Sequence, residues 1–148
     1  MLIKTLSLLQ PWAWIVVNWK GSPHIPTKRI ENRKTLKHIR GVYLIHSGSG
    51  FDNEGYAWIE RYIVNNHAIP QREKDRFLDI LKIANMSRGG IVGKMDIVGL
   101  GTAYDFWAMP GHNYLKLENV IPLPFFACPG RSSVFETDYP NGQSFGLK

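Results

Sequence analysis

The sequence has little cysteine and no long apolar run. Cys128 is the only cysteine, so no disulfide can form within the chain, and a reducing compartment is expected. No stretch of about 18 apolar residues is present, and the first residues lack the layout of a signal peptide. These absences predict a protein without a membrane span or a membrane partner, and we expect a cytoplasmic location.

Several catalytic signatures are also missing. The sequence contains neither a Gly-x-Ser-x-Gly elbow nor a carboxylate pair that stands out as an acid and base couple. The segment from Gly89 to Gly93 is not a phosphate-binding loop, because it lacks the following Lys-Ser or Lys-Thr and the helix. We expect no metal and no cofactor, because the histidines lack the paired spacing of metal ligands: His24, His38, His46, His67 and His112.

The positive charge of the chain is concentrated in one segment. The chain has 148 residues, enough for one domain, and a net charge of +6, and residues 28–40 hold six cations and one acid. A local excess of cations near aromatic residues indicates a polyanion such as nucleic acid as partner, although many such segments are only solvated loops. The six cations are Lys28, Arg29, Arg33, Lys34, Lys37 and Arg40.

The one acid in this segment, Glu31, is surrounded in sequence by cations. An acid so placed is expected to be ionised and held by its neighbours. It can orient Lys28 or Arg33, or it can accept a hydrogen bond from a ligand amine. Lys28, Glu31 and Arg33 therefore form the candidate site, and Arg29 and Lys34 are expected to meet phosphates beside it.

The residues before the basic segment predict a strand followed by a short helix. Residues 5–8 are typical of a strand, Pro11 suits the first position of a helix, and Gly21 ends that helix. Of the three tryptophans in this part of the chain, at least two are expected to pack in the core, with Trp12 on the apolar face. Gln10, just before the helix, either caps it or contacts a ligand beside Trp12.

The rest of the chain predicts strands with two helices inserted early. Expected strands cover residues 40–46, 90–100, 114–120 and 132–135. Expected helices cover residues 52–66, with Asp52 as the N-cap, and residues 70–85. His46, at the end of the first of these strands, is either a core or edge residue or part of a cleft. These elements predict an α+β protein, mostly β, with one domain over residues 1–137. Residues 138–148 are polar and glycine-rich, and we expect a weakly ordered tail.

Four short motifs, taken in order, resemble the ASCH domain family. They are Leu6-Ser7-x-x-Gln10-Pro11-Trp12-Ala13-Trp14, Ile30-Glu31-Asn32-Arg33, Gly41-x-x-Leu44-Ile45-His46 and Gly89-Gly90-Ile91-Val92-Gly93. Their order and spacing agree over residues 5–136, nearly the whole chain. ASCH domains are similar to PUA domains, so the resemblance implies a PUA-like mixed β-barrel with helices flanking a cleft.

The resemblance implies two kinds of function. ASCH domains bind nucleic acid, chiefly RNA, and some small bacterial members are amidohydrolases that remove the acetyl group of N4-acetylcytidine. In those members a Lys-x-x-Thr-x-Arg stretch supplies a catalytic Lys and Thr, with a more distant catalytic Glu. Alignment on Arg33 places these two positions at Lys28 and Glu31, and Glu31 has no hydroxyl to act as nucleophile. Ribonuclease activity, with Lys28 binding a phosphate, is a further alternative.

Three hypotheses follow from these observations. The first is an RNA-binding domain in which a base or nucleoside enters a cleft and phosphates meet the cations. The second is a hydrolase acting on a modified nucleoside, with Lys28 and Glu31 as the catalytic residues. The third is an interaction module that binds a protein or a small anion. The residues expected to bind ligand are Gln10, Trp12, Lys28, Arg29, Glu31, Arg33, Lys34, His46 and, reinforcing phosphate binding near the C-terminal end, Arg131.

Overall fold

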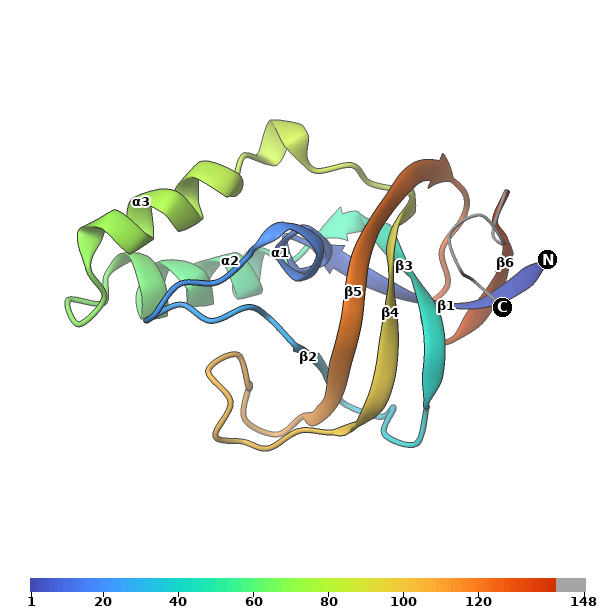
Figure 1. Ribbon diagram of the computed structural model, residues 1–148, viewed down its shortest axis with the longest axis horizontal. Coiled ribbons are helices and arrows are strands. Elements are labelled where there is room, and N and C mark those ends of the chain that lie inside the picture. Colours follow the sequence, from blue (N-terminus) through green and yellow to red (C-terminus); the bar gives the residue numbers. More distant parts are fainter. Residues whose placement is uncertain (141–148) are drawn as a thin grey trace.

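Six strands and three α-helices make up the computed structural model, which describes residues 1–140 (Figure 1). The predicted α+β class is therefore confirmed. The strands are β1 (Leu2–Gln10), β2 (Ile30–Arg33), β3 (Gly41–Phe51), β4 (Gly90–Leu100), β5 (Asn113–Ala127) and β6 (Phe135–Asp138). The helices are α1 (Trp12–Asn18), α2 (Asn53–Ile59), which a π-helical turn continues over Glu60–Val64, and α3 (Gln71–Ile80), which a short 3-10 turn follows at Ile83–Asn85.

The strands form one mixed sheet in the order β2-β5-β4-β3-β1-β6. Only β1 and β3 run parallel, and every other neighbouring pair is antiparallel. The outer strands β2 and β6 do not pair with each other within residues 1–140, so the hydrogen-bonded sheet is open. Register shifts along β4 and β5 bend these long strands, as extra residues in a ladder do.

Two features of the sheet differ from the sequence-based expectation. Residues 30–33 were expected in a basic loop, but they form β2, because Ile30 packs into the core and the strand pairs with β5. The strand expected to end at residue 120 continues through Pro122 and Pro124. Since β2 pairs with β5 only as far as Lys116, the rest of β5 lies at an edge of the sheet, where proline removes no ladder hydrogen bond.

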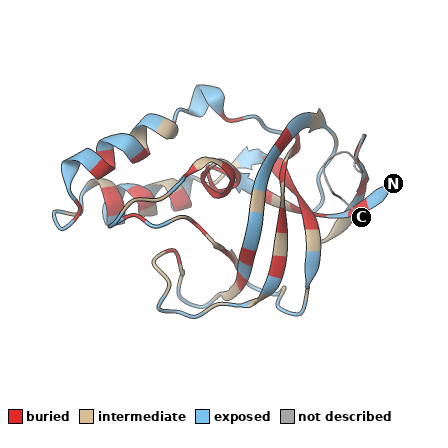
Figure 2. Ribbon diagram, viewed as in Figure 1, coloured by how far each residue is buried: buried red, intermediate tan, exposed pale blue. Residues whose placement is uncertain are grey.

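Helix α1 is buried between the sheet and the other helices (Figures 1 and 2). Trp12 and Ile15 join a core cluster with residues of α2 and α3, while Val16 joins a second cluster formed with the strands. An apolar surface on all sides is typical of a helix enclosed in a core. Trp12 and Trp19 are buried, which confirms the expectation that at least two tryptophans pack in the core.

The first turn of α2 is fixed by Asp52, as its predicted role of N-cap requires. One carboxylate oxygen of Asp52 accepts a hydrogen bond from Gly55 N at 2.9 Å, and the other accepts from Trp12 Nε1 at 2.7 Å. The predicted helix over residues 52–66 is present but changes to π geometry after Ile59. Asp52 therefore connects α2 to α1.

A buried acid holds α3 against the loop that follows α1. The Glu73 carboxylate accepts hydrogen bonds from the Ser22 hydroxyl at 2.5 Å and from His24 N at 2.7 Å, and it lies 2.6 Å from His24 Nδ1. Burial alone would raise the pKa of Glu73, but these contacts outweigh it and lower the pKa to about 2. Glu73 is therefore ionised in the folded protein and serves the structure.

The folded part extends slightly beyond the boundary predicted at residue 137. Asp138 ends β6 and lies 2.7 Å from the N-terminal amine, and Tyr139 is buried with its hydroxyl donating to the Pro124 carbonyl at 2.8 Å. The remainder of the expected tail, residues 141–148, lies outside the described residues. Within residues 1–140, no helix has the length and apolar character needed to cross a membrane.

A substitution at Gly55 tests how tightly α2 packs against Trp12. A Cβ at this position would lie 2.5 Å from Asp52 Oδ2 and 2.6 Å from Trp12 Cζ2. We expect Gly55→Ala to lower the free energy of unfolding by about 1–3 kcal/mol through overpacking, although alanine favours a helix interior by about 1 kcal/mol. Denaturant unfolding measures this change. Gly99→Ala is the control, because its Cβ would meet only Arg40 Nε, at 4.0 Å. Equal stability of both variants and the parent would contradict the packing described.

Candidate functional site

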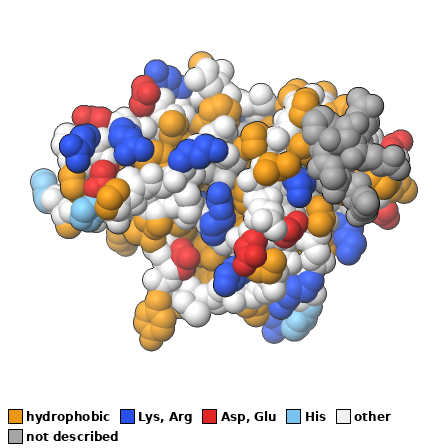
Figure 3. Space-filling model, viewed as in Figure 1, with side chains coloured by type: hydrophobic (Ala, Val, Ile, Leu, Met, Phe, Trp, Pro, Cys, Tyr) orange, Lys and Arg blue, Asp and Glu red, His pale blue; other side chains and the backbone are white. Residues whose placement is uncertain are grey.

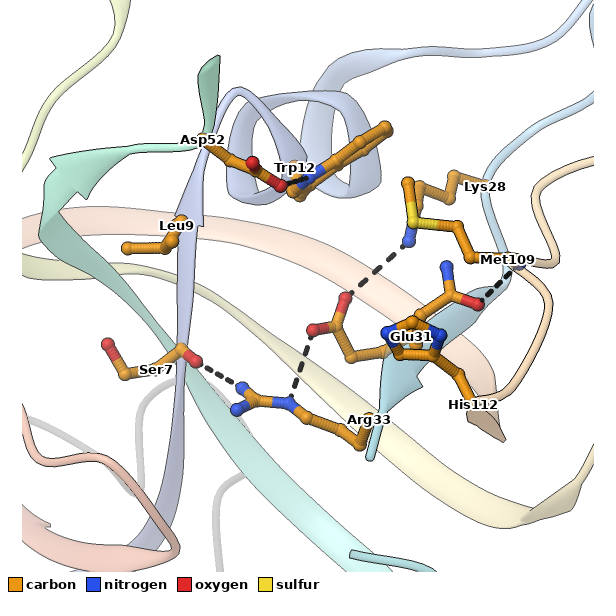
Figure 4. A pocket seen from close by; sticks show the side chains of 10 residues that line it. Ser7, Leu9, Trp12, Lys28, Glu31, Arg33, Asp52, Met109 and His112 are labelled. Carbon is orange, nitrogen blue, oxygen red and sulfur yellow. Dashed lines mark hydrogen bonds and ion pairs between the residues drawn. The ribbon is translucent and has the colours of Figure 1, made fainter. Parts of the chain in front are cut away.

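A polar pocket of about 200 Å³ opens beside β1 and β2, and we call it the Glu31 pocket. Four of the residues predicted to bind ligand, Trp12, Lys28, Glu31 and Arg33, line it together (Figure 4). They come from α1, from the segment before β2 and from β2 itself. The other lining residues are Ser7, Leu9, Asn32, Asp52, Met109 and His112.

Glu31 lies between the two cations of the pocket (Figure 4). Its Oε1 is 3.5 Å from Lys28 Nζ, and its Oε2 is 3.3 Å from Arg33 Nε. Glu31 and Arg33 project to the same side because they are two residues apart on a strand. Each carboxylate oxygen therefore has one cation nearby and keeps capacity to accept a further hydrogen bond from a ligand.

Lys28 is buried in the wall of the pocket rather than exposed to solvent phosphates. Lys28 is only 1% exposed to solvent. Its Nζ donates to the Ile30 carbonyl at 2.5 Å and lies 5.3 Å from the centre of the Trp12 ring. Burial lowers the pKa of Lys28 below its usual value, and the neighbouring Glu31 charge opposes part of that effect. Lys28 can therefore donate to a bound group, or act as a base in its neutral form.

Arg33 links β2 to β1 across the pocket. Its Nη2 donates to the Ser7 carbonyl, while the Ser7 hydroxyl points away from Arg33 (Figure 4). The Nε of Arg33 is buried and has no hydrogen-bond acceptor among the described residues, although Glu31 lies near enough to form an ion pair. A buried donor without an acceptor is costly, so Nε depends on the nearby Glu31 carboxylate to offset its burial.

Trp12 and Asp52 form one fixed wall of the pocket. The indole Nε1 donates to Asp52, and the ring packs edge-on against Trp58 and Trp107, each with ring centres 6.4 Å away. The sequence indicated Asp52 only as a helix cap, so its place in the pocket was missed. No local pattern could have indicated it, because the contact joins residues 40 positions apart.

The loop between β4 and β5 forms the opposite wall of the pocket, and the sequence alone did not predict that this loop lines the site. Asn32 Nδ2 donates to the Trp107 carbonyl at 3.0 Å, and its Oδ1 accepts from Met109 N at 2.9 Å. These two bonds hold the loop beside β2 and bring Met109 and His112 to the pocket. The exposed Tyr104 belongs to the same loop but does not line the Glu31 pocket.

Gln10 does not reach the Glu31 pocket. It is 0% exposed, its Oε1 accepts from Trp14 N at 2.8 Å, and its Nε2 donates to the Ser87 carbonyl at 2.8 Å. The amide therefore satisfies a free N–H in the first turn of α1 and ties that turn to the segment before β4. Of the two roles left open for Gln10, its contacts are those of the capping role, and the structure places it outside the Glu31 pocket.

The remaining basic residues are dispersed rather than gathered around Glu31. Arg29 lines a different depression with Lys116, and its guanidinium donates to the carbonyls of Val16 at 3.2 Å and Lys28 at 2.9 Å. Burial lowers the pKa of Arg29. Lys34 is exposed just beyond β2. In the view of Figure 3, Lys and Arg side chains are likewise spread over several parts of the surface.

His46 and Arg131 line a second pocket, which shares Ser7 and Leu9 with the Glu31 pocket. His46 is buried, and both of its ring nitrogens have partners, the Ser7 hydroxyl at 2.9 Å and the Cys128 carbonyl at 2.8 Å. The structure therefore brings six of the nine predicted binding residues to two adjoining pockets, and Gln10, Arg29 and Lys34 lie outside both. Ser7, which connects them, was part of a motif but was not predicted as a site residue.

Within residues 1–140, no three side chains of His, Cys, Asp or Glu come together in a way that could hold a metal ion. The comparisons with known proteins give no family: no protein-family model matches the chain, and a search of curated proteins finds no match. The geometry of the site and the motifs in the sequence are therefore the basis for its function.

The buried position of Lys28 leads to a prediction about its protonation. In NMR spectra of protein carrying 13C-labelled lysine, we expect the Lys28 side chain to titrate at a lower pH than the ordinary value of about 10.4. Because the unfolded chain then binds the proton more tightly, stability contributed by this group rises with pH between the folded and unfolded pKa. Glu31→Gln should lower the pKa of Lys28 further, since it removes the opposing negative charge.

The matched control for this titration is Glu118→Gln, which alters an exposed acid outside the Glu31 pocket. It should leave the Lys28 titration unchanged. A Lys28 signal that titrates at the ordinary lysine pH in every variant would show that this side chain is solvated and that the pocket is not built as described.

Proposed function

We propose that the protein is a nucleic-acid-binding domain of the ASCH type, and that the Glu31 pocket binds one unpaired RNA base. The proposal includes the PUA-like architecture, in which a curved β-sheet approaches a barrel and helices flank a cleft. It is supported by the motif order in the sequence, by the mixed sheet, and by a polar pocket at the position of the Glu31 and Arg33 motif.

The observation that carries the proposal is one carboxylate held between two cationic donors. The edge of a nucleobase presents N–H donors next to carbonyl or ring-nitrogen acceptors. Glu31 can accept from such an N–H, while Arg33 Nε and Lys28 Nζ can donate to the acceptor beside it. The indole of Trp12 and the side chain of Met109 supply apolar surface for the flat faces of a base.

The size and charge of the pocket favour a single-stranded ligand. A pocket of about 200 Å³ can admit one base, whereas a paired base in a duplex cannot leave its stack without unpairing. The lining residues include Glu31 and Asp52 as well as Lys28 and Arg33, so the pocket itself is not strongly cationic. Backbone phosphates are better placed on exposed cations outside it, such as Lys34 and Lys37.

Fluorescence anisotropy with labelled single-stranded RNA of mixed sequence tests the proposal. We expect Glu31→Gln to weaken binding by about 1–3 kcal/mol, because one base contact of the carboxylate is lost. Replacing Lys34 and Lys37 together by Ala should reduce the dependence of affinity on salt, since fewer counterions are released. Single-stranded DNA of the same sequence should bind less well if 2′-hydroxyl groups contribute.

The control is again Glu118→Gln, which carries the same change of charge outside the pocket. Binding that does not respond to Glu31→Gln but remains salt-sensitive would mean that the protein holds nucleic acid only through surface cations. No measurable binding to RNA or DNA at low salt would remove the proposed function.

The buried amine of Lys28 favours one second candidate, a hydrolase acting on a modified nucleoside such as N4-acetylcytidine. A neutral Lys28 takes a proton from a water molecule that attacks the acetyl carbonyl carbon, while Arg33 stabilises the oxyanion. The Lys28 ammonium then returns the proton to the N4 nitrogen as the C–N bond breaks, which releases acetate and cytidine. Incubation with N4-acetylcytidine, with release of acetate measured by chromatography, tests this candidate. Turnover that is lost in Lys28→Met and kept in Lys34→Ala would establish it, and an absence of turnover would leave the binding function alone.

A further inference from the structure

The second pocket, which we call the Arg131 pocket, has a volume of about 370 Å³ and adjoins the Glu31 pocket. The two pockets share Ser7 and Leu9 on β1, so one ligand can lie across this strand and enter both. Leu9 is 46% exposed at the shared rim and offers an apolar surface between two polar pockets. The other residues of the Arg131 pocket are His46, Gly48, Ser49, Gly50, Gly89, Cys128, Pro129, Gly130, Arg131 and Ser132.

The chemistry of the Arg131 pocket differs from that of the Glu31 pocket. No carboxylate of residues 1–140 is among its lining residues, whereas Glu31 and Asp52 both line the first pocket. Arg131 is exposed and has no ion-pair partner within residues 1–140. Glycines and serines make up much of the remaining lining, and these small side chains leave room for an anion beside Arg131. These properties favour binding of an anionic group in the Arg131 pocket over binding of the edge of a base.

The segment that carries Arg131 is held in place by a specific contact with His46. A Cβ on Gly130 would lie 2.5 Å from His46 Cε1, so only glycine allows the chain to pass this close to the ring. The Cys128 carbonyl then lies 2.8 Å from His46 Nε2 and can only accept a hydrogen bond. In the neutral ring, Nε2 therefore carries the proton and Nδ1 accepts from the Ser7 hydroxyl at 2.9 Å. The loop between β5 and β6, which carries Arg131, is thus packed against His46 of β3 and lines the pocket together with residues of β1 and β3.

We propose that the Arg131 pocket binds the phosphate of the nucleotide whose base occupies the Glu31 pocket. The inference rests on the proposed function and adds to it: the ligand is recognised as a nucleotide, with its sugar crossing Ser7 and Leu9. Arg131 supplies a guanidinium for charge-assisted hydrogen bonds to the phosphate oxygens. Charge decides which pocket takes the base and which takes the phosphate. Carboxylates line the Glu31 pocket, whereas none of residues 1–140 places a carboxylate in the lining of the Arg131 pocket.

Isothermal titration calorimetry with the four nucleosides and their 5′- and 3′-monophosphates tests this assignment. For the base that the protein prefers, we expect one monophosphate to bind about tenfold or more tightly than its nucleoside, as a charge-assisted contact implies. Arg131→Ala should remove this difference and leave nucleoside affinity unchanged, while Arg131→Lys should keep part of it. Arg72→Ala, which removes an exposed arginine from α3, is the control and should retain the full difference.

Inorganic phosphate is the second probe, because a free anion could use the same donors. We expect it to compete with the monophosphate only weakly and not to affect the nucleoside. Equal affinities for nucleoside and monophosphates, or a difference that persists in Arg131→Ala, would overturn the phosphate assignment while base binding stands. If neither nucleosides nor monophosphates bind, and Glu31→Gln leaves RNA affinity unchanged, base recognition in the Glu31 pocket is wrong as well.

Discussion

The site depends on the burial of Lys28 beside Glu31. A buried ammonium group loses its hydration, and that loss is offset here by the Ile30 carbonyl, by the Glu31 carboxylate and by the face of Trp12. Buried ion pairs of this kind add little net stability, because desolvation cancels much of the attraction. A hydrophobic side chain at position 28 would serve the core as well or better, so the presence of lysine and glutamate is better explained by recognition or chemistry in the pocket.

The fold prepares this site before any ligand arrives. Helix α1 is enclosed in the core and fixes Trp12, while Asn32 holds the loop that carries Met109. Arg33 is anchored to the Ser7 carbonyl and still has a donor without an acceptor. Most polar groups around the pocket are thus held by contacts within the protein before a ligand binds. Such preorganisation lowers the entropy lost on binding.

The sequence predicted the regular elements better than it predicted the site. The strand over residues 90–100 was predicted with its observed bounds because it is rich in β-branched and other apolar residues and has loops on both sides. Strand β5 was predicted too short, since its prolines are tolerated only at an edge that tertiary pairing creates. In the site, Lys28, Glu31 and Arg33 were identified because they are close in sequence. Arg29 satisfied the same criterion and points elsewhere, and so does Gln10, which was chosen because it precedes the helix that carries Trp12. Asp52 and Met109 reach the pocket only through long-range packing.

The central claim is that a base enters the Glu31 pocket rather than that RNA merely rests on surface cations. Two-dimensional 15N NMR of the Arg33 guanidinium and of the tryptophan indoles during titration with single-stranded RNA tests this claim most directly. The account predicts large shifts for Arg33 Nε and Trp12 Nε1, with the buried Trp19 indole, whose Nε1 donates to Ile25 O, unchanged as an internal reference. Shifts confined to the guanidinium of the exposed Arg40, with Arg33 and Trp12 unaffected, would contradict it.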